Sequence, residues 1–284
     1  MDIYDYRATK ERKYARMICD ERRNAKSEKI SVRTEVGYID GYLYRPQKSV
    51  NKNLPVVFNL HGGGFVLGYC EQDGKYCQMI ADEAQCAVIN IDYCLAPEHK
   101  FPLPVLTTYE FIKEVLVNYE SYGIDKDKAV ILGSSAGGTL AASLCLLARE
   151  KNDFTFLSQI LNYPIVDLTN KRYQEDPTCS RTKDYINWYL ENESDGKSIL
   201  ASPLLADLTN LPRTLMIVAE LDPFMEDDIK YADKLSSSSV ETECIIFKNR
   251  QHGFTHDIFE NEYNKNDSDK AWREIIRFLI EIFG

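Results

Sequence analysis

The chain has 284 residues, of which 44% are hydrophobic and 27% are charged, and its 34 basic and 44 acidic side chains give a formal net charge of −10. This composition is typical of a globular protein with a sizeable core. An acidic chain lacks the concentrated basic surface that phosphate binding requires, so we expect no nucleic-acid partner.

The first 33 residues are basic, with ten Lys or Arg and six Asp or Glu, whereas the remainder of the chain is acidic. Within them Tyr14, Met17 and Ile18 stand at helical spacing among charges, which predicts an amphipathic helix that lies on a larger body. The sequence contains no apolar run approaching the ~18 residues of a membrane span and no signal-peptide pattern. We therefore expect a cytoplasmic protein that binds no membrane.

The eight cysteines are scattered along the chain, and none belongs to a Cys-x-x-Cys pair. This spacing predicts reduced thiols, because both a disulfide scaffold and a zinc site need closer or more numerous cysteines. Cys86 and Cys145 stand in apolar stretches and are expected to pack as small hydrophobic residues. We predict no metal site and no nucleophilic cysteine.

Apolar runs of strand length alternate with helical patterns along the rest of the chain. Alternating residues over 34–44, with turn signals at Gly37 and Asp40-Gly41, predict an antiparallel hairpin. Strands are predicted at 54–60, 87–92, 128–133, 156–163, 213–219 and 243–247, and helices at 140–149 and 269–283. Because parallel strands need crossover connections, this alternation predicts an α/β fold with a mostly parallel central sheet flanked by helices.

Two segments depart from the alternation, the basic N-terminus at about 1–30 and a polar, Tyr-rich stretch at about 165–203. Stretches longer than ~12 to 15 residues without regular structure are unusual unless they cover a site. We therefore predict a single domain over 1–284 in which these two segments form a small helical cap. An irregular surface excursion with no role in binding is the alternative.

A candidate nucleophile follows the strand at 128–133. The run Gly133-Ser-Ser-Ala-Gly137 fits the pattern G-x-S-x-G between a predicted strand and a predicted helix, where glycines permit a sharp turn. Ser135 would stand at the tip of that turn, with a helix N-terminus behind it to stabilise negative charge. A plain turn of small residues is the structural alternative, and Ser134 lacks a glycine two residues before it.

A serine hydroxyl needs a base to take its proton, and the base needs a third group, usually a carboxylate, to orient it. His252 follows the last predicted strand and Asp222 follows the strand before it. Both would project from the carboxyl ends of strands, where open α/β sheets bind ligands. His256 is the rival base, farther from the strand end. The rival acids stand in a predicted helix, where a solvated face is the more common outcome: Glu226, Asp227 and Asp228.

Three consecutive glycines, in His61-Gly-Gly-Gly64, follow the strand at 54–60. Each costs ~0.5 to 1 kcal/mol of backbone entropy relative to Ala, so their presence indicates that the backbone approaches something closely. We expect the amides of Gly63 and Gly64, with that of Ala136, to form an oxyanion hole. A plain glycine-rich turn is the alternative, but it does not account for the serine and histidine downstream.

These motifs together resemble the hormone-sensitive-lipase-like family of α/β-hydrolase esterases, also called bacterial family IV. The order of Ser135, Asp222 and His252 is the α/β-hydrolase order. The resemblance covers about residues 54–254 and is carried by His61-Gly-Gly-Gly-Phe-Val-Leu-Gly68, Asp92-Tyr-Cys-Leu-Ala-Pro-Glu98, Gly133-Ser-Ser-Ala-Gly-Gly138, Ala219-Glu-Leu-Asp-Pro-Phe224 and His252-Gly-Phe254. It implies the α/β-hydrolase fold and the same catalytic and oxyanion residues.

Two residues depart from the family's pattern, since Ser134 stands where Asp is usual and Cys94 where Arg is usual. Neither change removes a catalytic group. We expect both to alter the packing around the nucleophile, as a buried Arg and its carboxylate partner would be lost together.

The resemblance implies a serine carboxylic ester hydrolase that forms an acyl-enzyme, needs no cofactor and favours short acyl esters such as acetyl or butyryl. Tyr185 and Trp188 of the cap are candidates for lining the substrate pocket, with ordinary packing as the alternative for each. An amidase or formamide hydrolase is the alternative enzyme, and a noncatalytic ligand receptor is the alternative from another class. Similar proteins also suggest a homodimer formed through an edge strand near the C-terminus.

Overall fold

The computed structural model describes residues 2–24, 26–48, 53–68 and 70–284. The strands are β1 (Glu28–Thr34), β2 (Gly37–Tyr44), β3 (Leu54–Leu60), β4 (Ala87–Asp92), β5 (Ile124–Ser134), β6 (Ser158–Asn162), β7 (Arg213–Ala219) and β8 (Thr242–Phe247). They form one sheet in the order β1-β2-β4-β3-β5-β6-β7-β8. β2 is antiparallel to both of its neighbours, and all other adjacent strands are parallel, so the predicted α/β fold is confirmed.

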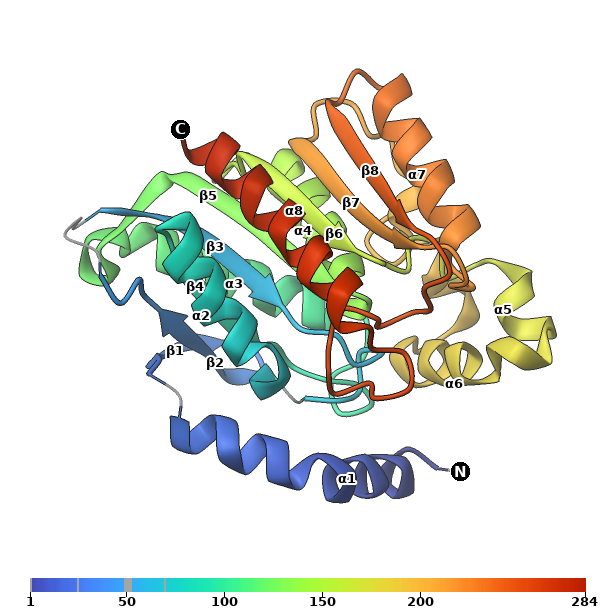
Figure 1. The fold of residues 1–284 in the computed structure, drawn as a ribbon. Coiled ribbons are helices and arrows are strands. Elements are labelled where there is room, and N and C mark those ends of the chain that lie inside the picture. The colour runs from blue at the N-terminus through green and yellow to red at the C-terminus, as the bar shows by residue number, and fades with distance from the viewer. Residues whose placement is uncertain (1, 25, 49–52, 69) are drawn as a thin grey trace.

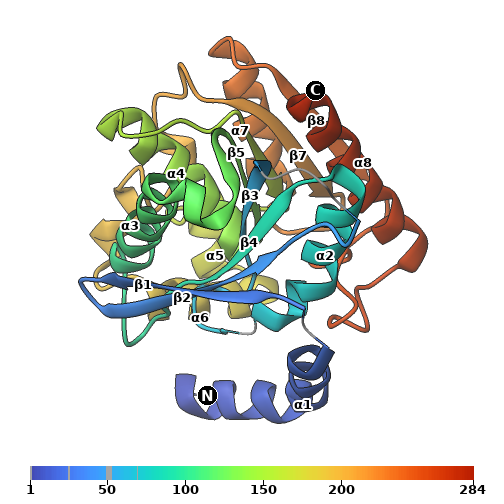
Figure 2. The same cartoon turned by 90° about the vertical axis from the view of Figure 1, so that its left-hand side faces the viewer.

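Helices cover both faces of this sheet (Figures 1 and 2). The α-helices are α1 (Ile3–Asn24), α2 (Gly74–Ala84), α3 (Leu103–Val117), α4 (Ala136–Lys151), α5 (Lys171–Glu175), α6 (Ser180–Tyr189), α7 (Met225–Ser237) and α8 (Lys265–Phe283). Within the described ranges, short 3-10 helices lie at Cys70–Asp73, Tyr119–Tyr122, Pro177–Cys179, Glu193–Lys197 and Pro203–Leu205. Helices α2 and α8 pack on one face, and α3, α4 and α7 pack on the other.

The central strands are buried on both sides, which explains why their sequences are continuous apolar runs and not alternating ones. In β3, Val57 belongs to the core under α2 and α8, whereas its neighbour Phe58 belongs to the core under α3 and α4. The predicted strands at 54–60, 87–92 and 213–219 coincide with β3, β4 and β7. Because β5, β7 and β8 run in the same direction, their carboxyl ends lie at the same edge of the sheet.

The hairpin is displaced from its prediction. β1 begins at Glu28, the turn lies at residues 35–36, and Asp40-Gly41 lies inside β2, where Gly41 pairs with Ile30. The physical reason is a contact with α3: a Cβ added to Gly41 would lie 2.6 Å from the ring of Phe111. Gly41 is therefore a close-packing glycine and not a turn residue.

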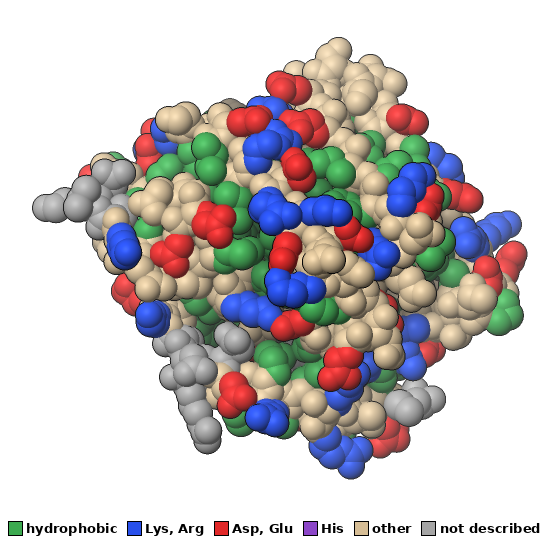
Figure 3. Space-filling view, viewed as in Figure 1, with side chains coloured by type: hydrophobic (Ala, Val, Ile, Leu, Met, Phe, Trp, Pro, Cys, Tyr) green, Lys and Arg blue, Asp and Glu red, His purple; other side chains and the backbone are tan. Residues whose placement is uncertain are grey.

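Charged side chains of both signs are interspersed over the face of the molecule that Figure 3 shows. On α8, for example, Arg277 pairs with Glu281 at 2.6 Å and also with Glu243 of β8 at 2.6 Å. Among the described residues, no helix is long and apolar enough to pass through a membrane.

Helix α1 lies beside helix α6 of the segment 165–203 (Figure 1), although their contacting residues Tyr6 and Tyr185 are 179 positions apart in sequence. The ring of Tyr6 on α1 lies 5.9 Å from that of Tyr185 and 5.5 Å from that of Trp188, both on α6. Arg7 fastens α1 to the body of the protein, because its guanidinium donates to the carbonyl oxygen of Val66 at 2.7 Å and pairs with Glu98 at 2.6 Å. Long-range contacts therefore bring α1 against α6.

Candidate active site

Ser135 stands at the turn between β5 and α4, with φ of 55° and ψ of −120°. A side chain rarely adopts this backbone region, so the surrounding structure must hold it there. The two flanking glycines make the turn possible: a Cβ on Gly137 would lie 2.1 Å from the carbonyl oxygen of Leu60, and one on Gly133 would lie 2.1 Å from that of Gly137. The G-x-S-x-G spacing is thus a packing requirement of this turn.

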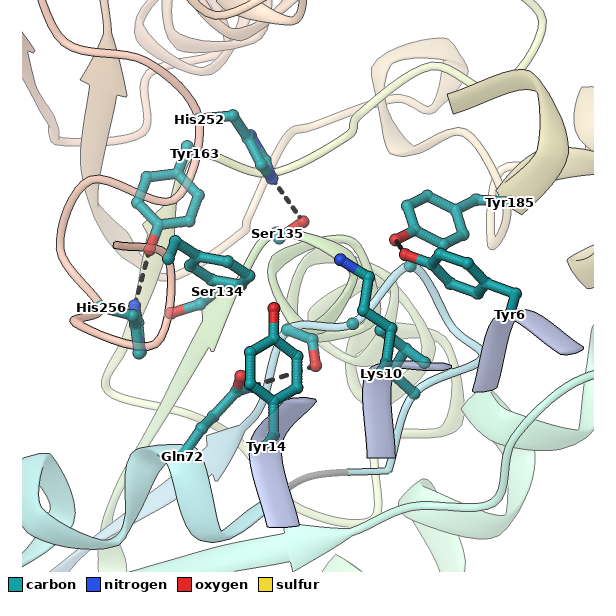
Figure 4. Close-up of a pocket in the computed structure, with 15 residues that line it drawn as sticks. Tyr6, Lys10, Tyr14, Gln72, Ser134, Ser135, Tyr163, Tyr185, His252 and His256 are labelled. Atoms are coloured by element: carbon teal, nitrogen blue, oxygen red, sulfur yellow. Dashed lines mark hydrogen bonds between the residues drawn. The ribbon is translucent and has the colours of Figure 1, made fainter. Parts of the chain in front are cut away.

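The structure brings Ser135, His252 and Asp222 together, and Figure 4 shows the contact of the first two. Ser135 Oγ lies 2.8 Å from His252 Nε2, and His252 Nδ1 lies 2.6 Å from Asp222 Oδ2. With Nδ1–H donating to the carboxylate, Nε2 is left as the acceptor for the serine hydroxyl. The Asp222 side chain is fully buried, and its Oδ1 accepts a hydrogen bond from the amide of Phe224 at 3.0 Å.

Two aromatic rings fix the orientation of the His252 imidazole. Tyr163 and Phe224 pack edge-on against it, with ring centroids at 4.9 and 5.1 Å. Neither residue was predicted from the sequence to take part in the site. The Asn162-Tyr163-Pro164 run at the end of β6 carries no signal for this role, because the contact depends on how β6 and the loop after β8 are placed in space.

His256 belongs to a different polar cluster. It is buried, its Nδ1 lies 2.8 Å from the hydroxyl of Tyr163 and its Nε2 lies 3.2 Å from Asp73 Oδ1. Among the described residues, it makes no hydrogen bond to Ser135. The rival base is therefore engaged elsewhere, since both of its nitrogens face polar partners inside the protein.

The three rival acids differ in their environments. Glu226 is exposed, as expected for a solvated face, but Asp227 and Asp228 are buried, so the expectation was wrong for these two. Asp227 accepts hydrogen bonds from Asn170, Tyr173 and Lys230 at 2.6 to 2.9 Å. The reason is that the first turn of α7 packs inward, beneath the segment that carries α5.

Asp228 gives the first testable prediction. Its carboxyl group is fully buried without a hydrogen-bond partner among the described residues, and burial, followed by the charges of Asp222 and Asp227, raises its pKa well above the usual range. In the unfolded chain, an Asp side chain loses its proton at about pH 4. Between that pH and the higher pKa of the folded state, only the folded protein holds this proton, so the free energy of unfolding decreases as pH rises. Asp228→Asn, which stays neutral, should raise the Tm at alkaline pH by about 2 to 4 °C.

Thermal unfolding of the wild type and the variant at pH 5 and pH 8 checks this, and the gain should be larger at pH 8. Asp227→Asn is the matched control, and its expected change in Tm at pH 8 has the opposite sign. Despite the burial of Asp227, hydrogen bonds from Lys230, Asn170 and Tyr173 lower its pKa. The ionised carboxylate therefore stabilises the folded state at pH values above the pKa that Asp227 has in the unfolded chain. That variant should lose Tm at pH 8. An equal gain for Asp228→Asn at both pH values would contradict the prediction.

The glycine loop after β3 passes directly beside the nucleophile. A Cβ on Gly62 would lie 3.5 Å from that of Ser135, so the two turns are in van der Waals reach. Gly63 and Gly64 have φ of 137° and 60°, and a Cβ on Gly64 would lie 2.5 Å from the Tyr185 ring. Among the described residues, no hydrogen bond occupies the amides of Gly63, Gly64 or Ala136. The amides predicted as oxyanion donors are thus gathered near Ser135 and uncommitted.

The two departures from the family pattern each have a local partner. Ser134 is buried, and its Oγ accepts a hydrogen bond from Asn162 Nδ2 at 3.2 Å. Cys94 is also buried, with its Sγ 3.3 Å from Thr107 Oγ1. Both positions are therefore satisfied without a buried ion pair.

A cavity of about 100 Å³ opens over Ser135. Segments far apart in the chain meet around it, among them α1, α6, the glycine loop and the loop after β8 (Figure 4). The lining residues that the motifs did not indicate include Tyr6, Lys10, Tyr14, Gln72, Tyr163 and Phe259. Tyr185 is among the lining residues, whereas Trp188 is not and packs against Tyr6 and Tyr185. For the lining residues on α1, the one sequence signal was the helical spacing of apolar residues in the N-terminal segment.

A family model described as alpha/beta hydrolase fold matches residues 57–256. Among curated proteins, the chain is 36% identical over 221 residues to an arylesterase of Saccharolobus solfataricus, covering 75% of this chain and 71% of that one. It is 31% identical over 218 residues to the carboxylesterase NlhH of Mycobacterium tuberculosis, covering 73% and 68%.

The solved structures of similar proteins agree with these matches. A hyperthermophilic esterase from Pyrobaculum calidifontis superposes with a TM-score of 0.88 at 31% identity, covering 99% of this chain and 94% of that one. The thermostable carboxylesterase EstE1, cloned from a metagenomic library, gives a TM-score of 0.88 at 27% identity, covering 100% and 98%. The likeness therefore extends over the whole sheet and both helical layers.

Proposed function

The chain belongs to the α/β-hydrolase family matched over residues 57–256, and on that premise we propose that it is a serine carboxylic ester hydrolase acting on short-acyl esters through an acyl-enzyme. The observation that carries the proposal is the hydrogen-bonded series from Ser135 through His252 to Asp222. The proteins named as esterases among its relatives support the same class of reaction.

In the proposed mechanism, Ser135 Oγ attacks the ester carbonyl while His252 Nε2 takes its proton. The buried Asp222 carboxylate stabilises the resulting imidazolium. The carbonyl oxygen, now negative, accepts hydrogen bonds from the amides of Gly63, Gly64 and Ala136, and the N-terminus of α4 adds favourable electrostatics.

The tetrahedral intermediate collapses to an acyl-enzyme, which water then hydrolyses. His252 gives its proton to the leaving alcohol, which departs, and next removes a proton from a water molecule that attacks the acyl carbonyl. The second tetrahedral intermediate then collapses: the bond from Ser135 Oγ to the acyl carbon breaks, His252 returns its proton to Oγ, and the carboxylic acid leaves. Besides the ester and water, the proposed chemistry uses side chains and backbone amides of this chain.

We propose that α1 and the segment 165–203 act as the cap of one domain over 1–284. The contact of Tyr6 with Tyr185 supports this, because it joins the two segments at the wall of the cavity. Tyr185 is proposed to contact substrate, and Trp188 to hold Tyr185 and Tyr6 in place. The cytoplasmic location and the homodimer stay predictions.

Two other functions remain distinguishable by experiment. A noncatalytic receptor is disfavoured because all three groups needed for catalysis are present at hydrogen-bonding distances. An amidase would use the same residues, since they can attack other acyl groups. Only the choice of substrate separates it from an esterase.

A panel of p-nitrophenyl esters tests the proposal. We expect kcat/KM for the acetate or butyrate ester to exceed that for the palmitate ester by at least about 100-fold, which corresponds to ~2.7 kcal/mol. The reason is that a long acyl chain must displace the hydrogen-bonded pair formed by Tyr6 and Tyr185 at the cavity wall. Rapid mixing should also show a burst of nitrophenol equal to the enzyme concentration if deacylation is slower than acylation. Preference for palmitate, or turnover of acyl anilides without turnover of esters, would contradict the proposal.

A further inference from the structure

One charged side chain lines the cavity over Ser135. Of the described residues that form its wall, Lys10 of α1 is the one Lys, Arg, Asp or Glu. Figure 4 shows its ammonium end pointing toward Ser135, between the ring of Tyr14 and the pair formed by Tyr6 and Tyr185. Any substrate bound at Ser135 must therefore lie close to a positive charge.

The Lys10 ammonium has no carboxylate within ion-pair distance among the described residues. It lies 5.5 and 5.7 Å from the ring centroids of Tyr6 and Tyr14, a cation-π arrangement that offsets part of its lost hydration. Burial, and then the charges of Lys13 and Arg181, lower the pKa of Lys10. A partly buried cation beside other cations favours an anionic ligand, because an anion restores the interactions that burial removed.

Glu262, in the segment that follows β8, is an opposing charge that acts on Lys10. The charge of Glu262 raises the pKa of Lys10. This effect is smaller than each of the lowering effects, which come from burial, Lys13 and Arg181. Arg181 itself lies 4.3 Å from the centroid of the Tyr6 ring and pairs with Asp184. The positive charge of Lys10 is thus not neutralised by its surroundings.

Two phenol groups add a hydrogen-bond donor beside the ammonium. The hydroxyls of Tyr6 and Tyr185 hydrogen-bond to each other. In such a pair one O–H donates to the other oxygen, and the second O–H stays available to donate. Burial raises the pKa of both tyrosines, so each keeps its proton. An ammonium and a phenol O–H on one wall form a suitable receptor for a carboxylate, which accepts hydrogen bonds only.

We propose that Lys10 is a specificity-determining residue that selects esters carrying a carboxylate at an end away from the scissile bond. The inference rests on the proposed ester hydrolysis at Ser135 and names the substrate class of that site. The carboxylate would pair with the Lys10 ammonium and accept the free O–H of the Tyr6 and Tyr185 pair, while the scissile carbonyl lies at Ser135.

Matched pairs of charged and neutral esters test this inference. On the alcohol side the pair is 4-acetoxybenzoate and its methyl ester, and on the acyl side it is p-nitrophenyl hydrogen adipate and its methyl ester. The readout is the ratio of kcat/KM for the charged ester to that for the neutral ester. In at least one pair, Lys10→Met should lower this ratio by about tenfold or more, or ~1.4 kcal/mol of discrimination.

Two further variants separate the local charge from general effects. Lys10→Arg keeps the charge and should retain most of the ratio. Lys13 is an exposed cation on the same helix, but it does not line the cavity. Lys13→Met should therefore leave the ratio unchanged. A ratio between two substrates does not change when a variant merely folds less well, since both rates then fall together.

An unchanged ratio in Lys10→Met for both pairs would overturn the inference, as would an equal fall in Lys13→Met. A wild-type protein that hydrolyses none of the four esters would instead contradict the proposed function itself. The two failures are thus distinguishable in one set of assays.

Discussion

Replacing Ser135 by alanine is expected to lower kcat for p-nitrophenyl acetate by about 10⁴- to 10⁶-fold, the size of effect seen when a serine nucleophile is removed. The hydroxyl lies 2.8 Å from His252 Nε2, and the alanine variant would leave no oxygen in its place. The small remaining rate would come from substrate binding and the oxyanion amides. Steady-state assays over time, with excess substrate, measure the loss.

Ser134→Ala is the matched control, because it removes the neighbouring hydroxyl of the same turn. Asn162 keeps a second partner in Thr255 Oγ1, at 3.1 Å, so this variant should fold and retain most activity. A serine-directed phosphonate should label Ser135 in the wild type and in Ser134→Ala, as read by peptide mass spectrometry. Equal rates for Ser135→Ala and the wild type, or a label on another residue, would refute the site.

Asp222→Asn should lower kcat by about 10⁴-fold. The buried carboxylate accepts the proton of His252 Nδ1 at 2.6 Å, whereas an amide NH₂ in its place would favour the tautomer with the proton on Nε2. That tautomer cannot accept the serine proton. Because Tyr163 and Phe224 still hold the imidazole, the loss should arise from protonation and not from displacement of the ring.

Asp228→Asn is the control for this second prediction. Asp228 is as deeply buried and lies close enough to Asp222 for the two charges to interact, but it makes no hydrogen bond among the described residues. We expect near wild-type kcat together with the altered thermal stability predicted above. If both asparagine variants lost activity equally, the role of Asp222 would be one of general electrostatics, and its assignment as the orienting acid would be wrong.

The strands of the fold were predictable where both faces are buried. Residues 54–60 and 213–219 coincide with β3 and β7, because a strand between two helical layers is apolar at most of its positions. The edge hairpin was harder to place. Gly41 has the appearance of a turn residue, yet it is a glycine because the ring of Phe111 packs against it.

Helices α2 and α3 were not predicted, because their usual signals are absent. α2 follows Asp73, whose side chain makes no capping hydrogen bond, and it ends at Ala84, before Gln85, which adopts the left-handed conformation where glycine is usual. α3 has Pro102 at its N-cap, which provides no side-chain capping hydrogen bond, and it is buried over much of its circumference, so its apolar residues show little helical periodicity. Tertiary packing, not local preference, stabilises both.

The sequence by itself determined the residues of the candidate chemistry, Ser135, Asp222, His252 and the glycine loop, because each belongs to a short pattern tied to the end of a buried strand. Only the tertiary structure decided what surrounds them. It directed His256 toward Asp73, buried Asp227 and Asp228, and carried Tyr6 and Lys10 from α1 to the cavity. These outcomes depend on contacts between segments far apart in the chain, whose free energies follow from packing and not from local spacing.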